Sequence, residues 1–81
     1  MWYVYIATFS GGKLYTGITT NVKRRIEEHN KGIGAKSLRG KGPVILVYSE
    51  VQPDQKMAGK REREVKGWSH EKKLILIQGL L

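Results

Sequence analysis

The N-terminal residues 1–17 constrain the fold more strongly than any other part of the chain. Residues 2–9, WYVYIATF, are aromatic and β-branched, which favours a strand that is buried on both faces or nearly so. Residues 10–13 contain two glycines and predict a turn. Residues 14–16 then return as a second strand, which we expect to end at Gly17. The chain is therefore expected to begin with a β-hairpin.

The length of the hairpin loop decides where the two central tyrosines point. A two-residue turn at Gly11-Gly12 would pair Thr8 with Tyr15 and place Tyr5 and Tyr15 on opposite faces of the sheet. An odd loop, or a glycine bulge, would instead pair Ala7 with Tyr15 and put both phenols on one face. We predict the second arrangement, because a site shared by both tyrosines requires it.

A short helix follows the hairpin. Asn21 is a favourable N-cap residue and Gly32 stands where a C′ glycine would fall, so the helix is expected over residues 22–30. A Ser or Asn cap followed by a glycine stop is a common way to bound a helix of this length.

The two adjacent arginines of this helix have different surroundings. At about 100° per residue, Val22 and Ile26 form the core-facing stripe, and Arg25 and His29 lie beside it. Arg24 points about 200° away from Val22, into solvent. Arg25 is therefore expected at the edge of the core, where a guanidinium can bind a phosphate through two parallel hydrogen bonds.

The middle of the chain alternates between a basic loop and an apolar strand. Residues 31–43 are rich in glycine, lysine and arginine and predict a loop that is flexible when free. Lys36, Arg39 and Lys41 could contact phosphates there, or the segment could be a solvated connection. Residues 44–48, VILVY, predict a buried strand in the same sheet as the hairpin.

The C-terminal part predicts two helices. A helix is expected over residues 54–67, with Glu62 on its core-facing edge and Glu64 on its wet side. Ser69 is a good cap for a third segment. Residues 74–77, LILI, fit a helix or a strand by pattern, and we predict a helix because of the cap.

Length and charge limit the classes of protein to consider. The 81 residues predict a single domain, and the absence of cysteine excludes disulfides and thiolate zinc sites. A net charge of +8 is typical of a protein that binds phosphates. The chain shows neither a signal-peptide pattern nor an apolar run long enough to cross a bilayer, so we expect a soluble protein of the cytoplasm.

Two tyrosine-containing triplets and the residues after them resemble the GIY-YIG nuclease family. The triplets are Tyr3-Val4-Tyr5 and Tyr15-Thr16-Gly17, at the family's spacing. Arg25 stands at the family's arginine position in the helix after the second triplet, and His29 follows one turn later. Glu62, in REREVKGW, stands at the metal-binding glutamate. The resemblance covers nearly the whole chain and is greatest to small stand-alone bacterial members.

The resemblance implies a fold and a chemistry. The fold is an α/β (α+β) sandwich with a three-stranded, mainly antiparallel sheet flanked by helices, in the order ββαβαα and as one domain over residues 1–81. The chemistry is hydrolysis of a phosphodiester with Mg²⁺ or Mn²⁺. Glu62 would hold the metal, Arg25 would neutralise charge on the phosphoryl oxygens, and Tyr15 or Tyr5 would position or deprotonate the attacking water. His29 would hydrogen-bond a tyrosine or relay its proton.

These implications predict a Mg²⁺-dependent DNA endonuclease of low sequence specificity, serving repair or recombination. Leu74 stands where many catalytic members carry asparagine, so a nucleic-acid-binding module without turnover is one alternative, and a small basic protein acting on RNA or a ribosomal particle is another. No membrane contact and no small-molecule cofactor are expected. The cations expected to contact nucleic acid are Lys23, Lys36, Arg39, Lys41, Arg61 and Lys66.

Overall fold

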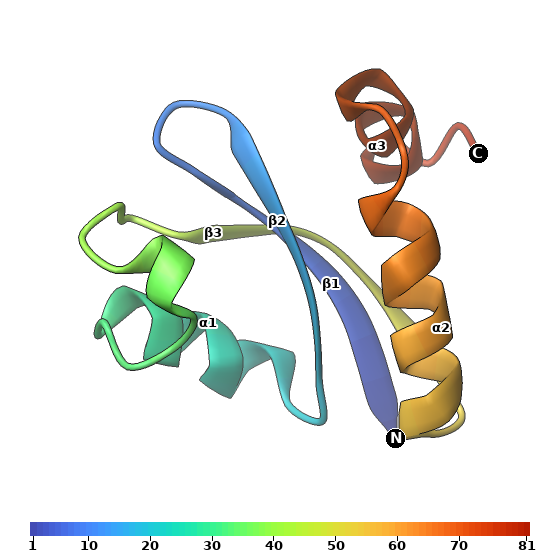
Figure 1. The fold of residues 1–81 in the computed structure, drawn as a ribbon, viewed down its shortest axis with the longest axis horizontal. Coiled ribbons are helices and arrows are strands. Elements are labelled where there is room, and N and C mark those ends of the chain that lie inside the picture. The colour runs from blue at the N-terminus through green and yellow to red at the C-terminus, as the bar shows by residue number, and fades with distance from the viewer.

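The computed structural model describes residues 1–81 and shows a three-stranded antiparallel sheet with helices on both faces (Figure 1). Strand β1 lies at the centre, between β2 and β3. The predicted ββαβαα order is confirmed, with one short 3-10 helix added. The elements are β1 (Trp2–Phe9), β2 (Lys13–Thr19), α1 (Val22–Asn30), η1 (Lys36–Leu38), β3 (Ile45–Gln52), α2 (Gln55–Lys66) and α3 (His70–Ile77).

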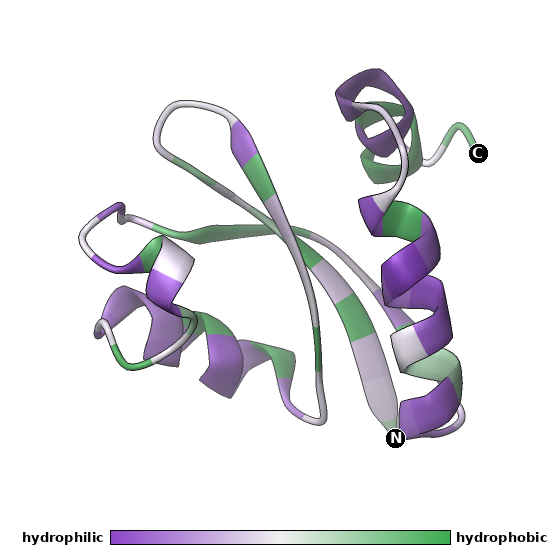
Figure 2. Ribbon diagram, in the orientation of Figure 1, coloured by the Kyte–Doolittle hydropathy of each residue, from purple (hydrophilic) through white to green (hydrophobic).

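The sheet separates two small cores. On the face covered by α1, Ala7, Leu38 and Val44 form one buried cluster. On the face covered by α2 and α3, Ile6 packs with residues of both helices in a second cluster. The α2 ribbon is mostly hydrophilic, whereas hydrophobic colour concentrates in the strands and in parts of α3 (Figure 2). β1 supplies apolar side chains to both cores, which explains why its central residues Val4–Ala7 are at most 1% exposed.

The hairpin register places the two tyrosines on one face, as predicted. Ala7 is paired with Tyr15 and Tyr5 with Gly17. Phe9 pairs with Lys13, so the loop has the three residues 10–12, an odd number, and all three have positive φ, at 46°, 78° and 121°.

The prediction that the second strand ends at Gly17 is wrong. β2 continues to Thr19, and Gly17 pairs with Tyr5 inside the ladder. Glycine is present there because the Tyr5 side chain occupies the space above it: a Cβ at Gly17 would lie 2.6 Å from Tyr5 Oη. The glycine therefore marks a close approach of a side chain to the strand, which a pattern-based assignment takes for a strand end.

The predicted helix caps are present. Asn21 Oδ1 accepts a hydrogen bond from the Arg24 N–H at 3.0 Å, and Gly32 adopts φ 77° just after the α1 C-cap. Ser69 accepts from the Lys72 N–H and starts α3, which confirms the choice of a helix for that segment. None of the helices is long and apolar enough to span a membrane.

The prediction of a buried strand at residues 44–48 is wrong in two respects. Val44 is buried but precedes β3, and Ile45 and Leu46 within the strand are 54% and 40% exposed. β3 lies at the sheet edge, so α1 covers its inner face only in part. The continuous apolar run therefore predicted more burial than this strand has.

The basic loop at residues 31–43 is also more structured than its composition suggests. It contains η1, and Leu38 is buried to 1% exposure against the α1-side core. Asn30 holds the far end of the loop, since its side-chain amide donates to the Val44 carbonyl at 3.0 Å and accepts from the Val44 N–H at 2.7 Å. One buried leucine and the two hydrogen bonds of the Asn30 side chain therefore hold in place a segment that lacks helix or strand periodicity.

Candidate active site

Three aromatic side chains from three different elements meet on the α1 face of the sheet. Tyr5 comes from β1, Tyr15 from β2 and His29 from α1. The ring centroids are 6.2 Å apart for the two tyrosines, 6.0 Å for Tyr5 and His29, and 5.5 Å for Tyr15 and His29. Each ring is within contact distance of the other two, so the predicted convergence of these residues is observed.

The Tyr5 side chain crosses from the central strand to the outer strand. Its ring lies over Gly17, which belongs to the edge strand β2. The hydroxyl group thus reaches the border of the sheet, where groups from the α1 face and the α2 face can both approach. Both Arg25 of α1 and Glu62 of α2 are close enough to Tyr5 to affect its ionisation.

The Tyr5 phenol holds its proton tightly. Burial and the neighbouring Tyr15 raise the pKa of Tyr5 to about 12, with a smaller contribution from the Glu62 carboxylate, and the Arg25 guanidinium opposes this shift. At neutral pH Tyr5 is therefore a neutral phenol that can donate one hydrogen bond and accept others.

His29 is buried and makes a hydrogen bond from each ring nitrogen. Its Nε2 lies 2.8 Å from Tyr5 Oη, and its Nδ1 accepts the backbone N–H of Ala35 at 3.2 Å. The residue is only 3% exposed. Burial, and then the charge of Arg25, hold the pKa of His29 below its usual range, so the imidazole is neutral at pH 7.

Arg25 lies at the edge of this cluster, as predicted. Its side chain is 33% exposed, and Nη1 donates to Glu28 Oε1 at 3.1 Å. The hydrogen bond with Glu28 is the main cause that raises the pKa of Arg25, so the guanidinium stays charged. A guanidinium carries five N–H donors, and the remaining ones are available to a phosphate.

Glu62 and Glu64 differ in exposure as predicted. The Glu62 side chain is 20% exposed and the Glu64 side chain 55%. Glu62 Oε2 forms an ion pair with Lys66 Nζ at 3.3 Å, one turn along α2. The Glu62 carboxylate is near enough to Tyr5 to contribute to its raised pKa, as the smallest of the causes, while Glu64 faces solvent and pairs with Arg61.

Comparison with known proteins agrees with this geometry. The family model of the GIY-YIG catalytic domain matches residues 1–74. The chain belongs to the GIY-YIG family. This membership indicates a nuclease-type function with nucleic acid as the substrate.

Small stand-alone relatives resemble this GIY-YIG domain over most of their length. It is 47% identical over 76 residues to a UPF0213 protein of Photorhabdus laumondii, covering 94% of this chain and 73% of the relative. A UPF0213 protein of Haloquadratum walsbyi is 51% identical over 76 residues, with 94% and 85% covered. The solution NMR structure of a UPF0213 protein from Bacillus halodurans superposes with a TM-score of 0.61 at 46% identity, covering 96% of this chain and 84% of that one.

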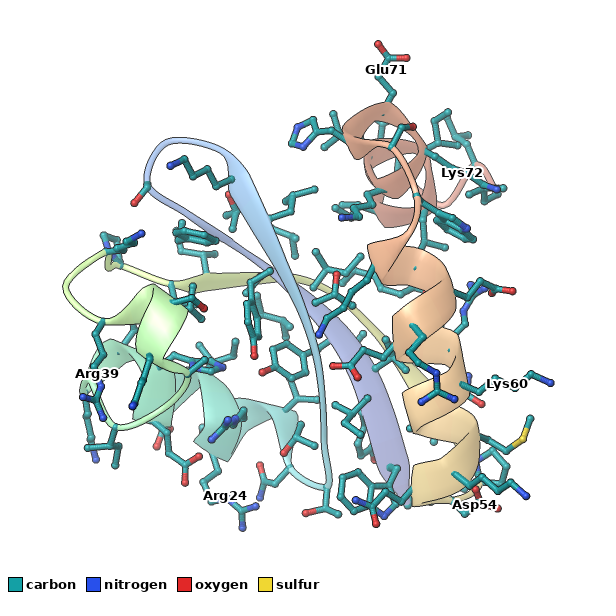
Figure 3. All side chains as sticks on the ribbon, in the orientation of Figure 1. Arg24, Arg39, Asp54, Lys60, Glu71 and Lys72 are labelled. Atoms are coloured by element: carbon teal, nitrogen blue, oxygen red, sulfur yellow. The ribbon has the colours of Figure 1, made fainter.

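The six cations that were predicted to contact nucleic acid fall into two groups. Lys23, Lys36, Arg39 and Lys41 are exposed and form no ion pair. Figure 3 shows Arg39, on the loop beside α1, directed away from the sheet. These side chains can reach a phosphate without breaking an existing contact.

Arg61 and Lys66, the other two predicted contacts to nucleic acid, are engaged within the protein. Arg61 Nε donates to Glu50 Oε2 at 3.1 Å, its Nη1 pairs with Glu64, and its guanidinium lies 5.1 Å from the Trp68 ring centroid. Lys66 pairs with Glu62. Their roles in nucleic-acid binding stay predictions, and a phosphate would have to compete with these internal partners.

The polar network around Glu50 was not predicted from the sequence. Glu50 accepts hydrogen bonds from Tyr48 and Gln52, both at 2.7 Å, as well as from Arg61. Burial alone would raise the pKa of Glu50, but the hydrogen bonds from Tyr48, Arg61 and Gln52 outweigh it and lower the pKa. The signal was the alternation of three polar-tipped residues along β3, which puts them on one face.

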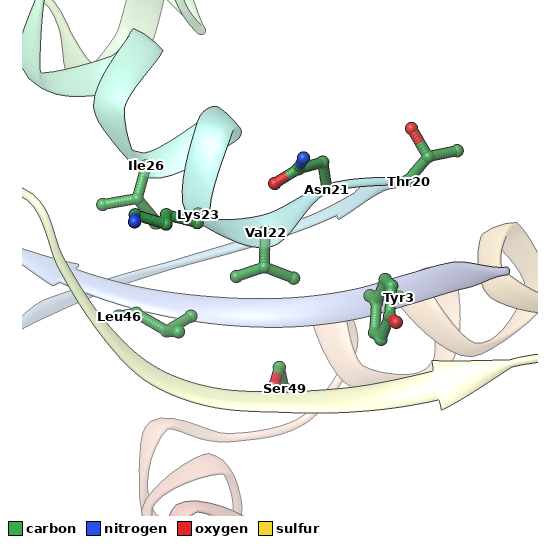
Figure 4. A pocket seen from close by; sticks show the side chains of 8 residues that line it. All are labelled: Tyr3, Thr20, Asn21, Val22, Lys23, Ile26, Leu46 and Ser49. Atoms are coloured by element: carbon green, nitrogen blue, oxygen red, sulfur yellow. The ribbon is translucent and has the colours of Figure 1, made fainter.

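The largest hollow on the surface lies away from the aromatic cluster. It has a volume of about 650 Å³ and opens between the first turn of α1 and β3 (Figure 4). None of the five predicted catalytic residues lines it. Its lining residues are Tyr3, Thr20, Asn21, Val22, Lys23, Ile26, Leu46 and Ser49.

Proposed function

We propose that the protein is a Mg²⁺-dependent endonuclease that hydrolyses DNA phosphodiesters with low sequence specificity, in repair or recombination. The observation that supports it most is the meeting of Tyr5, Tyr15 and His29 on one face of the sheet, with Arg25 and Glu62 near enough to affect the ionisation of Tyr5. A pair of phenols, a cation and a carboxylate are groups that phosphodiester hydrolysis can use when they lie close together.

The residues present fit a magnesium ion held mainly by substrate and water. No group of three or more acidic or histidine side chains converges in the structure, so a cage made only of protein ligands is absent. Mg²⁺ is commonly bound by one or two carboxylates, with waters and substrate phosphates filling the remaining positions. Glu62 would be that single carboxylate, and its ion pair with Lys66 would have to open. When bound, the metal would polarise the phosphate and stabilise the leaving oxygen.

The other side chains divide the remaining work according to their charge and proton content. Arg25 binds a non-bridging phosphate oxygen and neutralises the charge that develops on it. Tyr5 keeps its proton at neutral pH, which supports an orienting role for its hydroxyl. Tyr15 is then the phenol left to contact the attacking water, whose proton it accepts when its own hydroxyl is ionised to the phenolate. Lys23, Lys36, Arg39 and Lys41 bind backbone phosphates, which carry no base sequence, and this supports low specificity.

A nicking assay tests this proposal. Supercoiled plasmid is incubated with wild type, Arg25→Ala or Arg24→Ala, with and without Mg²⁺. We expect wild type to nick only with Mg²⁺, and Arg25→Ala to lose at least about 100-fold, in line with removal of a group that stabilises transition-state charge. Arg24→Ala is the matched control: the Arg24 side chain is 58% exposed against 33% for Arg25, it points away from the sheet in Figure 3, and its loss is expected to change the rate little.

The assay also separates the proposal from its alternatives. If wild type never cuts while its DNA binding remains sensitive to salt, the enzyme proposal fails and a binding module is left. Competition between DNA and RNA of equal length would reveal an RNA preference.

A further inference from the structure

The basic loop touches the aromatic cluster through its backbone. The N–H of Ala35 points at His29 Nδ1 from 3.2 Å. Gly34, the preceding residue, packs so closely against the imidazole that an added Cβ would collide with Nδ1. The loop is fixed in this position by buried Leu38 and by the two hydrogen bonds between Asn30 and Val44.

These contacts determine which nitrogen of His29 carries the proton. A ring nitrogen that accepts a hydrogen bond from the Ala35 N–H carries no proton of its own, so Nδ1 is unprotonated. A neutral imidazole carries one proton, which must then be on Nε2. Nε2 lies 2.8 Å from Tyr5 Oη, so His29 is the donor in that hydrogen bond and the phenol oxygen is the acceptor. A cationic His29 would place a second proton against the Ala35 N–H.

We infer that Gly34 and the Ala35 backbone are positioning residues that hold His29 as a fixed hydrogen-bond donor to Tyr5, so that His29 orients the phenol and does not remove its proton. The orienting role of His29 in catalysis rests on the proposed function, whereas the assignment of the tautomer does not depend on it. It gives the basic loop a second task beside phosphate contact.

The fixed Nε2–H donor of His29 determines where the hydroxyl proton of Tyr5 points. Because Tyr5 Oη accepts from His29, its own proton turns away from the imidazole. The groups around that proton are Tyr15 on β2, Arg25 on α1 and Glu62 on α2. The Arg25 guanidinium cannot accept a hydrogen bond, so the phenol proton is available to Tyr15, Glu62 or a solvent molecule. Tyr5 thereby stabilises negative charge on whichever of these groups develops it.

The tautomer can be observed directly by NMR. The chain contains two histidines, so long-range ¹H–¹⁵N spectra of the ¹⁵N-labelled protein are simple, and a His70→Gln variant assigns the second set of signals. At pH 7 we expect His29 to show a protonated Nε2 and a bare Nδ1. A spectrum with the proton on Nδ1, or equal populations of the two tautomers, would overturn the inference.

Two glycine variants test the role of the loop. In Gly34→Ala the new methyl group displaces the backbone from Nδ1, and we expect the His29 signals to move toward a mixture of tautomers. Gly42→Ala, in the same loop, is the matched control, because its Cβ would meet nothing closer than 3.6 Å. An unchanged His29 spectrum in folded Gly34→Ala would contradict the positioning role. If Gly34→Ala does not fold, the wild-type spectrum still decides the tautomer.

A further pair of variants tests the donor role in the reaction. His29→Gln keeps an N–H donor but cannot take up a proton, whereas His29→Leu offers neither. We expect His29→Gln to lose less of the wild-type nicking rate than His29→Leu, and the two variants to differ by about 2-fold to 10-fold, the range for a hydrogen bond between neutral groups. Equal loss in both variants would show that His29 acts as a base. If wild type does not nick at all, the proposed function fails, while the NMR result still decides the tautomer.

Discussion

The Tyr5 ring lies directly over Gly17, its cross-strand partner, and leaves no room for a side chain there. A Cβ at position 17 would lie 2.6 Å from Tyr5 Oη and 2.8 Å from Cζ. We expect Gly17→Ala to push the phenol off His29 and to cost about 1–3 kcal/mol of the free energy of unfolding, as overpacking usually does. Urea unfolding measures the stability, and the nicking assay should show loss of activity.

The control for Gly17→Ala is Gly59→Ala in α2. There the nearest atom to an added Cβ is the mobile end of Arg63, at 3.7 Å. Alanine is the better helix former by roughly 1 kcal/mol, so this variant should be more stable than wild type and equally active. If Gly17→Ala unfolds at the wild-type urea concentration, Tyr5 does not fill the space over position 17.

The two glutamates one helical half-turn apart on α2 provide a matched pair for the metal role. Glu62→Gln removes the half-buried carboxylate beside Tyr5, and Glu64→Gln removes an exposed one. We expect Glu62→Gln to abolish Mg²⁺-dependent nicking but to leave DNA binding intact, because the amide is a poor ligand for a hard cation. Glu64→Gln should cut like wild type. Similar losses in both variants would argue for a general charge effect instead of a metal ligand at Glu62.

Much of the site could be predicted because its elements are bounded by local signals. Asn21 and Ser69 each cap a helix as predicted, and helical spacing then put Glu62, and not Glu64, at the protected edge. The hairpin register, by contrast, was chosen because a site shared by Tyr5 and Tyr15 requires both on one face; the loop residues themselves fit either turn.

The errors arose where exposure or packing depends on distant segments. The length of β2 depends on the Tyr5 ring that covers Gly17, and the exposure of Ile45 depends on β3 being at the edge of the sheet. Neither property is encoded within the strand itself. The loop at residues 31–43 lacks periodicity, yet Leu38 and the following Val44 pack with Ala7 in the core on the α1 face of the sheet. Composition alone therefore did not reveal these contacts.

Burial of neutral His29 makes folding stability depend on pH. The pKa of His29 is lowered in the folded protein, by burial first and Arg25 second, relative to an unfolded value near 6.5. Below pH 6.5 the unfolded chain binds the proton first, so stability falls as pH drops until the lowered folded pKa is reached. The slope for one proton is at most about 1.4 kcal/mol per pH unit. Urea unfolding between pH 7 and pH 5 should show this slope in wild type and lose it in His29→Gln, whereas His70→Gln should retain it.

The contact between Arg61 and Glu50 predicts a second effect of pH on stability. The lowered pKa of Glu50 means that its carboxylate stabilises the fold above the ordinary value of 4.5, and that this contribution is lost as pH falls through the lowered pKa. Arg61→Gln should cost about 1–3 kcal/mol at pH 7, the range for hydrogen bonds to a charged group. The cost should shrink in strong acid. Exposed Lys60, which points into solvent in Figure 3, gives the control variant Lys60→Gln.

The free cations of the basic loop should set the salt dependence of DNA binding. Lys36, Arg39 and Lys41 form no internal ion pair, so replacing all three by glutamine removes phosphate contacts without unpairing a carboxylate. Each lost contact should reduce the slope of log K against log salt concentration by about 0.9 on duplex DNA. Fluorescence anisotropy over a range of NaCl concentrations measures the slope. Arg61→Gln is the comparison, because that guanidinium is held by Glu50 and should change the slope far less. A triple variant with the wild-type slope would mean that the loop does not contact the DNA backbone.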